Sequence, residues 1–235
     1  MKSKTKNKTV VIAGLTGRGK RLRVKAAITV AVLLIAGASF AQNKAKDLLD
    51  SSSEAFAKAG NLSAAFTIDV KDTQGKQTVA YEGVIDIKDR QFHIQTPDNE
   101  IWFNGQTQWV LQKSWLEVNI SEPTGQEAQT LHPGNILSIY KKNCKYKYVG
   151  EKTDVKMRKV HEIELIPGNK KSEMKKIILQ INASDRMPVM FHIYFANQIE
   201  NLIYIDKYQT NLNLPDSLFV FDAKKYPDAE IIDLR

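Results

Sequence analysis

The chain has 235 residues, with 34 Lys and Arg side chains against 26 Asp and Glu and a formal net charge of +8. Residues 1–41 hold nine of the basic residues and no acidic one, which leaves 25 basic against 26 acidic residues over 42–235. A strongly basic domain would suggest nucleic acid as a partner. Because the excess charge belongs to a short N-terminal arm, the sequence excludes nucleic acid as a partner of the remaining residues.

The N-terminal arm has the pattern of a secretory signal peptide. Basic residues within 20–25 precede an apolar run at 26–36, and the small residues Ser39 and Ala41 suit the end of a cleavage site. The run is shorter than the ~20 apolar residues that a membrane-spanning helix needs. We therefore expect export to the periplasm with cleavage after Ala41, and a retained membrane anchor is the alternative. The residue after the cut is Gln42 rather than a cysteine, so lipid attachment through a thiol is not expected.

The remaining residues, 42–235, are enough for one domain with a sizeable core. Their single cysteine, Cys144, excludes an intrachain disulfide and a cysteine-based metal cluster. Residues 44–59 place apolar side chains at helical spacing, and Gly60 is typical of the position after a helix. We expect an amphipathic helix whose apolar stripe covers another part of the domain.

From residue 62 onward, apolar and polar residues alternate, which indicates strands with one apolar and one polar face. Short turns separate the strands, and Asn104-Gly105 is the strongest hairpin signal. We expect about ten antiparallel strands, including one over 115–120 and one over 155–166, and a short helix at 133–140. A sheet of this size curls or closes. With a helix laid across its apolar inner face, it would enclose an apolar cavity.

The sequence after residue 41 offers no enzyme motif: it lacks G-x-S-x-G, H-E-x-x-H and a G-x-G-x-x-G loop after a strand. His161, Glu162 and Glu164 could suggest a metal site, but in a strand His161 points away from the face of both glutamates. Lysines beside Cys144 could lower the pKa of its thiol, yet no partner histidine follows in a recognisable pattern. We therefore expect no enzymatic activity, no metal and no cofactor.

Two segments resemble the periplasmic outer-membrane lipoprotein carriers, the LolA family. One runs from Tyr81 to Lys88 (YEGVIDIK), reaches Phe92 and continues from Ile101 to Val110 (IWFNGQTQWV). In that family a strand of the form E-G-x-(hydrophobic)-x-(hydrophobic)-K leads into a Phe-bearing strand, and a D-G turn followed by K-T-x-W comes next. The other segment is 177–233, with a Phe-Val-Phe-Asp sequence before its final strand. The resemblance implies a mainly β fold, an unclosed antiparallel β-barrel with an α-helical lid.

The resemblance also implies a function. A carrier of this family would hold the acyl chains of lipoproteins in an apolar cavity and move them from the inner to the outer membrane. It would receive them from an inner-membrane ABC exporter, deliver them to an outer-membrane acceptor and act as a monomer. The candidate cavity and lid residues are Leu48, Leu49, Phe56, Phe66, Tyr81, Phe92, Ile94, Trp102, Trp109, Ile136 and Leu137.

A family arginine is associated with holding the lid closed. Arg90 is the nearest candidate here, although the chain has Lys88-Asp89-Arg90 where family members often carry Lys-Arg-Pro. The alternative function is a periplasmic regulatory domain that senses lipids or lipoproteins on the same fold. Such proteins generally add a second domain and an anchor, for which we expect no room in this chain. An enzyme acting on lipids would need a nucleophile constellation that the sequence does not offer.

Cleavage after Ala41 gives the first testable prediction. Because the basic, apolar and small-residue regions stand in the order of an export signal, the exported protein should begin at Gln42. N-terminal sequencing of periplasmic material checks this. Recovery of residues 2–25 on the exported form would contradict the assignment to the periplasm.

Overall fold

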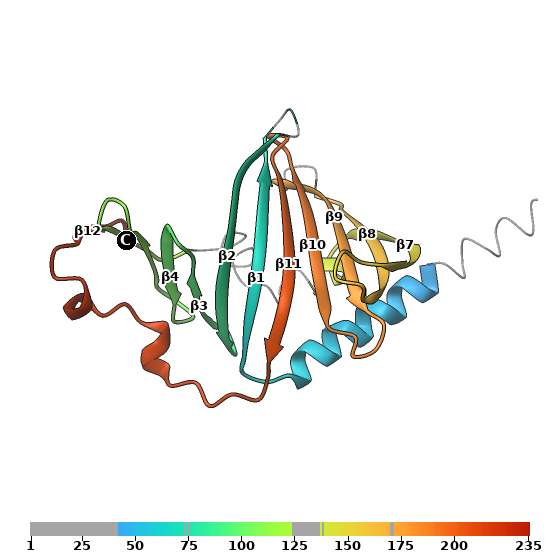
Figure 1. Cartoon of the computed structure of the whole chain (residues 1–235), viewed down its shortest axis with the longest axis horizontal. Helices are drawn as coiled ribbons and strands as arrows, with labels where there is room; N and C mark the ends of the chain where they lie inside the picture. Colours follow the sequence, from blue (N-terminus) through green and yellow to red (C-terminus); the bar gives the residue numbers. More distant parts are fainter. Residues whose placement is uncertain (1–41, 73, 75, 124–136, 138, 170–171) are drawn as a thin grey trace, which may run out of the picture. The chain divides into compact units, whose positions relative to one another are not determined.

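The helix predicted at residues 44–59 forms at 42–58 (Figure 1). The structure, a computed structural model, describes residues 42–72, 74, 76–123, 137, 139–169 and 172–235. Gly60 follows the helix with a φ of +63°, a left-handed conformation that glycine adopts without a steric penalty. Leu48 and Leu49, on the predicted apolar face, are only 6 % and 1 % exposed, so the rest of the domain covers this face.

The alternating region forms one sheet of twelve strands in the described part of the chain. The strands are β1 (Leu62–Lys71), β2 (Gln77–Lys88), β3 (Gln91–Gln95), β4 (Asn99–Phe103), β5 (Gln108–Gln112), β6 (Glu117–Ser121), β7 (Cys144–Thr153), β8 (Lys159–Pro167), β9 (Met174–Asn182), β10 (Pro188–Phe195), β11 (Glu200–Gln209) and β12 (Glu230–Asp233). Their order across the sheet is β12-β6-β5-β4-β3-β2-β1-β11-β10-β9-β8-β7. All neighbours are antiparallel except β12 and β6, which run parallel.

The two end strands, β12 and β7, stand at opposite ends of this order, so the sheet curls without closing. The helix lies along the β7 to β11 side (Figure 1). The predicted fold class, a mainly β, unclosed barrel with a helical lid, is therefore confirmed. We call residues 42–58 the lid helix, and the sheet face that it covers the inner face.

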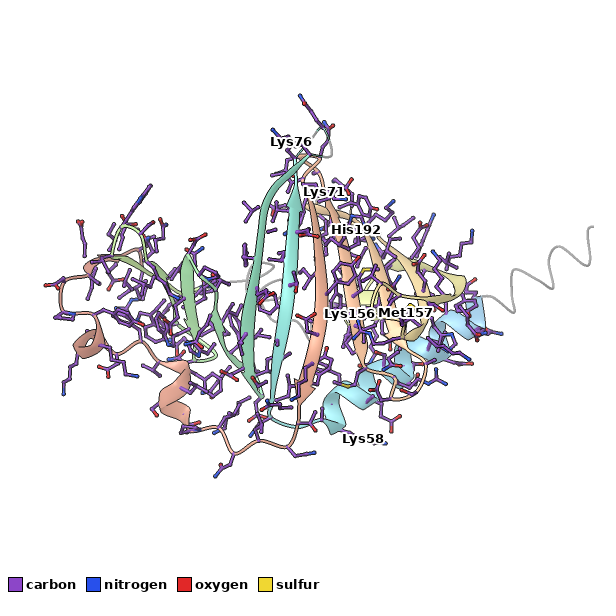
Figure 2. The ribbon with its side chains drawn as sticks, in the orientation of Figure 1. Lys58, Lys71, Lys76, Lys156, Met157 and His192 are labelled. Carbon is purple, nitrogen blue, oxygen red and sulfur yellow. The ribbon has the colours of Figure 1, made fainter. Side chains whose placement is uncertain are left out.

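Two strand boundaries differ from the prediction because turns take the ends of the expected strands. β6 begins at Glu117 rather than at 115, and β8 begins at Lys159 rather than at 155. In the second case Asp154 organises the turn: its backbone N donates to the Arg158 carbonyl at 2.9 Å, and its carboxylate accepts from the Arg158 backbone N at 2.7 Å. Lys156 in this turn bonds to Asp206 of β11, which brings the β7–β8 turn against that strand (Figure 2).

The short helix predicted at 133–140 lies mostly outside the described residues. Within them, a 3-10 turn η1 covers Ile139–Lys141. Two more 3-10 turns follow the last long strand, η2 at Asp216–Phe219 and η3 at Ala223–Lys225.

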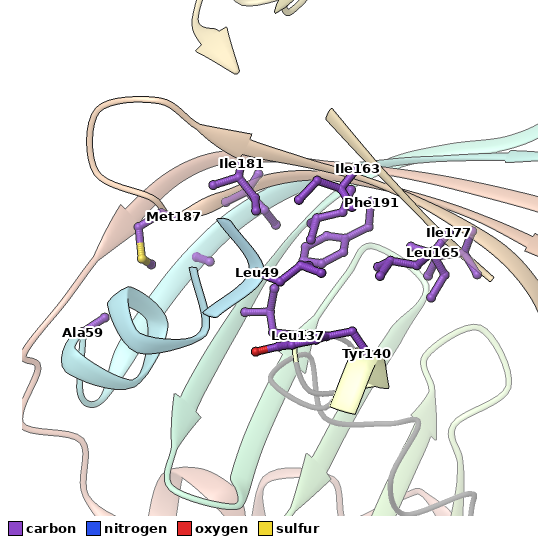
Figure 3. Close-up of a cluster of buried hydrophobic side chains, with 14 of the residues drawn as sticks. Leu49, Ala59, Leu137, Tyr140, Ile163, Leu165, Ile177, Ile181, Met187 and Phe191 are labelled. Carbon is purple, nitrogen blue, oxygen red and sulfur yellow. The ribbon is translucent and has the colours of Figure 1, made fainter. Parts of the chain in front are cut away.

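The main hydrophobic core lies between the lid helix and the inner face. Its central strand residues, Ile163, Leu165, Ile177, Leu179 and Ile181, are all fully buried. Leu49 of the lid helix lies at the centre of this group, with Leu137 and Tyr140 packed on its other side (Figure 3). The lid helix is thus held to the sheet by close apolar packing over its first half.

A second hydrophobic cluster lies on the opposite, outer face of β4 to β6. Trp102, Leu111, Val118 and Ile120 form its buried part. The chain after β11 crosses this face, and we call residues 212–229 the C-terminal strap (Figure 1). Phe221 and Tyr226 of the strap pack against the Trp102 ring, with ring centroids 5.3 Å and 6.0 Å away. The strap covers apolar side chains that would otherwise face solvent.

A buried polar network joins the strap to the sheet. His93 of β3 is 3 % exposed, and its Nε2 lies 2.8 Å from Glu100 Oε1 of β4. Glu100 Oε1 also accepts from Gln95 Nε2 at 3.2 Å, and Glu100 Oε2 accepts from the Tyr226 hydroxyl at 2.8 Å. On the other side of the ring, His93 Nδ1 lies 3.7 Å from an Asp86 carboxylate oxygen. Each charged group in this network therefore faces a group of complementary charge or a hydrogen-bond donor.

These contacts shift the pKa values of the network in opposite directions. Burial alone would raise the pKa of Glu100, but hydrogen bonds from His93, Tyr226 and Gln95 outweigh it and lower the pKa from 4.5 to about 2. Burial alone would lower the pKa of His93, but the carboxylates of Asp86 and Glu100 outweigh it and raise that pKa above 6.5. The stability that Glu100 contributes is present above pH 4.5 and is lost as the pH falls toward 2. The contribution of His93 is present below pH 6.5 and is lost as the pH rises through its folded-state pKa.

The second prediction concerns this network. Glu100→Gln should lower the free energy of unfolding at pH 6 by about 3 kcal/mol, the equivalent of the pKa shift at about 1.36 kcal/mol per unit. It should also make the free energy of unfolding less dependent on pH between 4.5 and 2. Urea unfolding at a series of pH values measures both effects. Glu82→Gln, on an exposed position of β2, is the matched control, and an equal loss in the two variants would contradict the role of the network.

Candidate functional site

An apolar cavity of about 250 Å³ lies between the lid helix and the inner face of the central strands. Phe56 is the residue that the lid helix contributes to its wall. The strands β1, β2, β3, β9, β10 and β11 contribute the rest: Leu62, Ala64, Phe66, Ile85, Ile87, Ile94, Met174, Phe191, Ile193, Phe195, Ile203, Ile205 and Tyr208. The helix therefore borders a space whose other walls are formed by the sheet.

The cavity wall offers its contents almost no polar group. Among the described residues of the wall, the Tyr208 hydroxyl is the one polar side-chain group, and it donates to the Pro188 carbonyl at 2.9 Å. Burial raises the pKa of Tyr208, so the hydroxyl stays neutral at physiological pH. Such a wall can stabilise an apolar ligand by removing it from water, and its described side chains present no acid, base or nucleophile to act on that ligand.

Gly83 explains how the cavity keeps its shape at β2. It pairs with Phe66 of β1 across the antiparallel ladder. A Cβ atom at position 83 would lie 2.5 Å from Phe66 Cζ and 2.8 Å from the Gln95 carbonyl oxygen. The Phe66 ring thus lies directly over the glycine, which leaves room for it between β1 and β3. This is a physical reason for the glycine of the Glu-Gly sequence that the family resemblance uses.

Polar contacts hold the lid helix at its N-terminal half. The Tyr140 hydroxyl donates to the Asp50 carboxylate, which also accepts from Lys46 Nζ at 2.6 Å. These bonds, first that from Lys46 and then that from Tyr140, lower the pKa of Asp50. Lys44 Nζ lies 4.4 Å from the centre of the Tyr148 ring of β7. Beyond the half of the helix that carries Phe56, the backbone bond from Asn211 N to Ala59 O at 2.9 Å fastens the residue that follows the helix.

The structure brings only some of the sequence-predicted residues into the cavity wall. Phe56, Phe66 and Ile94 line it. Leu48, Leu49 and Leu137 instead belong to the packed core between lid helix and sheet. Ile136 lies outside the described residues.

Phe92 also lies on the inner face, but it is packed core rather than cavity wall. It is 1 % exposed, and its ring centroid lies 5.1 Å from that of Phe103. Tyr81 is half-buried on β2, opposite Ile68 of β1, and does not line the cavity. Both residues lie on the predicted strands, but neither belongs to the cavity wall.

The placement of Trp102 and Trp109 in the cavity is wrong, because both rings lie on the outer face under the C-terminal strap. Trp102 pairs with Trp109 across the β4–β5 hairpin, and Phe103 beside it points to the inner face. Both faces of β4 are apolar here, so alternation alone could not tell which one faced the cavity. The strap that covers the outer face comes from residues more than a hundred positions later.

The described contacts of the lid helix do not include Arg90. This arginine is exposed in the turn between β2 and β3, and among the described residues no hydrogen bond or ion pair joins it to the lid helix. The neighbouring Lys88 fastens the C-terminal strap instead, because its Nζ donates to the Leu214 carbonyl at 3.0 Å and to an Asp216 carboxylate oxygen at 2.7 Å. The lid is held by the contacts to Asp50 and Lys44.

Sequence reasoning missed the cavity residues of the C-terminal half, such as Phe191, Ile203 and Ile205. The pairing of Ile85 with Ile94 could have been inferred, since the two strands are joined by a short turn. The pairing of β1 with β11 carries no local signal, because partners such as Ile68 and Ile203 lie far apart in the sequence.

The structure also places the residues that the sequence offered as reactive groups or metal ligands. Burial raises the pKa of the half-buried Cys144 thiol rather than the nearby lysines lowering it. Glu162 bonds to Lys152 and Gln180 on the outer face, whereas His161 lies beside Tyr148 on the inner face. Within the described residues there is no group of three side chains that could hold a metal ion. In the same residues no helix is long and apolar enough to cross a membrane.

The sequence matches the model of the outer membrane lipoprotein carrier protein LolA over residues 37–194. The chain belongs to the LolA family. This family is one of carrier proteins, and its fold serves binding rather than any known enzyme reaction. A search of curated proteins gave no match.

Solved structures are similar to this one at low sequence identity. An uncharacterized conserved protein from Thermus thermophilus aligns with a TM-score of 0.52 and 12 % identity over 80 % of this chain and 98 % of its own. LprF from Mycobacterium bovis gives a TM-score of 0.45 with 12 % identity over 74 % of this chain and 96 % of its own. A putative outer membrane lipoprotein-sorting protein domain from Vibrio parahaemolyticus gives 0.42 with 10 % identity over 76 % and 97 %.

The third prediction separates cavity wall from packed core on one strand of this LolA-family protein. Phe92→Ala should lower the free energy of unfolding by about 3–5 kcal/mol, because it leaves a void in close packing. Ile94→Ala, two residues along, should cost less than about 2 kcal/mol, because Ile94 is only partly buried and less apolar surface is removed from contact. Urea unfolding compares the two, and binding of a hydrophobic dye should rise only for Ile94→Ala. Equal losses of stability would contradict the assignment of Ile94 to the cavity wall.

Proposed function

We propose that this protein is a periplasmic carrier that binds the acyl chains of lipoproteins in its cavity and moves them from the inner to the outer membrane. The observation that carries the proposal is an apolar cavity under a helical lid in a member of the LolA family. The N-terminal segment with its export-signal pattern supports the location. The family supports an inner-membrane ABC exporter as the donor and an outer-membrane protein as the acceptor.

The size of the cavity indicates how cargo would enter. Sites for small organic ligands usually have volumes of roughly 300–1,000 Å³, and this cavity has about 250 Å³ with the lid in place. Movement of the lid helix would give a long acyl chain more room than this. Phe56 is the lid residue in the wall, so it occupies space that the cargo would take.

Competition between the lid helix and the cargo for the cavity would also help the cargo to leave. Each buried methylene group contributes about 0.8 kcal/mol, so a fully enclosed long acyl chain would be held by more than ~10 kcal/mol. When the chain leaves, the lid helix returns its own apolar face to the cavity and recovers part of that energy. The net affinity is then low enough for transfer to an acceptor.

The fourth prediction tests the carrier directly. Ile94→Glu should keep the sheet paired, since backbone hydrogen bonds do not depend on the side chain, and should place a charge on the cavity wall. Native mass spectrometry of protein purified from periplasm, with and without a co-expressed lipoprotein, should show bound lipoprotein for the wild type. The bound fraction should be at least about tenfold smaller for Ile94→Glu, because an acyl chain would have to cover the new charge.

Val84→Glu is the matched control, because Val84 lies on the outer face of the same strand pair and is 37 % exposed. It should bind lipoprotein as the wild type does. Absence of lipoprotein from the wild type, or equal loss in both variants, would contradict the carrier. Stable binding with no release to outer-membrane vesicles would favour a regulatory lipid-sensing domain instead.

A further inference from the structure

The turn between β5 and β6 exposes an unusual group of apolar side chains. Trp115 is 74 % exposed and Leu116 is 44 % exposed. Ile231 of β12 is 51 % exposed and pairs with Val118 of β6, and Glu230 N just before it donates to the Leu116 carbonyl at 2.8 Å, so β12 begins beside this turn. We call Trp115, Leu116 and Ile231 the apolar tip. Large exposed side chains grouped in this way, unlike scattered single ones, indicate an interaction site.

One residue of the apolar tip has a backbone conformation that is unfavourable for its side chain. Leu116 has a φ of +51°, in the left-handed region that glycine and asparagine adopt most easily. Most of the other non-glycine residues with positive φ are polar: Asp89, Asn143, Arg186, Gln198 and Asn211. An exposed leucine in this conformation adds nothing to the core, so its presence at the tip of a hairpin points to a role outside folding.

The charges near the apolar tip are turned away from it. Lys113 folds back, and its Nζ donates to the Thr96 carbonyl at 2.7 Å. Glu117 accepts from the Asn119 amide at 2.6 Å. Among the described residues no ion pair includes Trp115, Leu116 or their neighbours in the turn, so covering the tip would desolvate little charge.

The β7–β8 turn provides an internal comparison. Met157 there is 84 % exposed and also has a positive φ. However, Lys156 beside it bonds to Asp206, and Arg158 Nε donates to Asp154 at 2.6 Å (Figure 2). Arg158 Nη1 also donates to the Ile205 carbonyl at 2.9 Å, which fastens this turn to β11. Covering the β7–β8 turn would desolvate these ion pairs, which have no counterpart in the described residues of the apolar tip.

We propose that the apolar tip inserts into the interface of a lipid bilayer composed of zwitterionic lipids. Tryptophan favours the boundary between acyl chains and headgroups, where its ring is in an apolar region and its N–H remains hydrated. The charged residues closest in sequence to Trp115 and Leu116 are Lys113 and Glu117, which have opposite signs, so the tip has no basic patch that would favour an anionic surface. Three side chains are also far too few for a stable dimer, which needs roughly 800 Å² from each partner, but they suffice for weak, reversible membrane contact. This contact goes beyond the proposed carrier function and does not require any cargo.

The fifth prediction uses tryptophan fluorescence. The protein has three tryptophans, of which Trp102 is buried and Trp109 is half-buried, so Trp115 is the one that vesicles can reach. Residues 42–235, which lie within one compact unit, are mixed with phosphatidylcholine and phosphatidylethanolamine vesicles whose acyl chains carry bromine. We expect a shift of emission to shorter wavelength and quenching by the brominated lipid, at low and high salt alike.

Three variants decide the outcome. Trp115→Ser should weaken vesicle partitioning about tenfold, since it removes a large apolar side chain from the membrane contact. Leu116→Asn should also weaken partitioning but should raise the thermal unfolding midpoint, because asparagine suits the left-handed backbone. Met157→Ser, at the other exposed turn, should leave partitioning unchanged. No partitioning of the wild type, partitioning that survives in Trp115→Ser, or an equal loss in Met157→Ser would each overturn the proposal, and none of them bears on acyl-chain binding in the cavity.

Discussion

The open sheet has apolar side chains on both faces, and each face needs its own cover. On the inner face the lid helix provides it, with Leu49 packed among fully buried strand residues. On the outer face of β4 to β6 the C-terminal strap provides it, with Phe221 and Tyr226 against Trp102. The two covers differ in the chemistry that fastens them. The strap has a buried ionic network at Glu100, whereas the lid has polar bonds near one end and a cavity near the other.

This difference separates the part of the molecule that can move from the part that stays in place. In the described cavity wall the Tyr208 hydroxyl is already bonded to a carbonyl of the sheet, so opening the lid leaves that bond intact. The lid resists opening through apolar contact and through the Asp50 and Lys44 contacts at its N-terminal half. An apolar ligand can replace apolar contact directly, because both are non-directional. It cannot replace the directional hydrogen bonds that hold the strap at Glu100.

Local sequence signals predicted the local structure well. Gly60 marked the end of the lid helix, and Asn104-Gly105 marked the β4–β5 turn, because both signals act within a few residues. The face of Trp102 could not be predicted in this way. Its burial depends on strap residues such as Tyr226, and only the folded chain brings them together. Phe92 and Ile94 show the same limit on a smaller scale, since one strand passes from packed core to cavity wall within two residues.

The unclosed sheet also has a consequence for how copies of the protein meet. β7 is an end strand, and no other described strand pairs with its second side. Exposed edges of this kind tend to pair between molecules and to start aggregation. Lys145 and Lys147 project from β7 as exposed side chains, and two such edges brought together would place these like charges near one another. The lysines of β7 thus disfavour pairing of this strand with the same strand of a second copy.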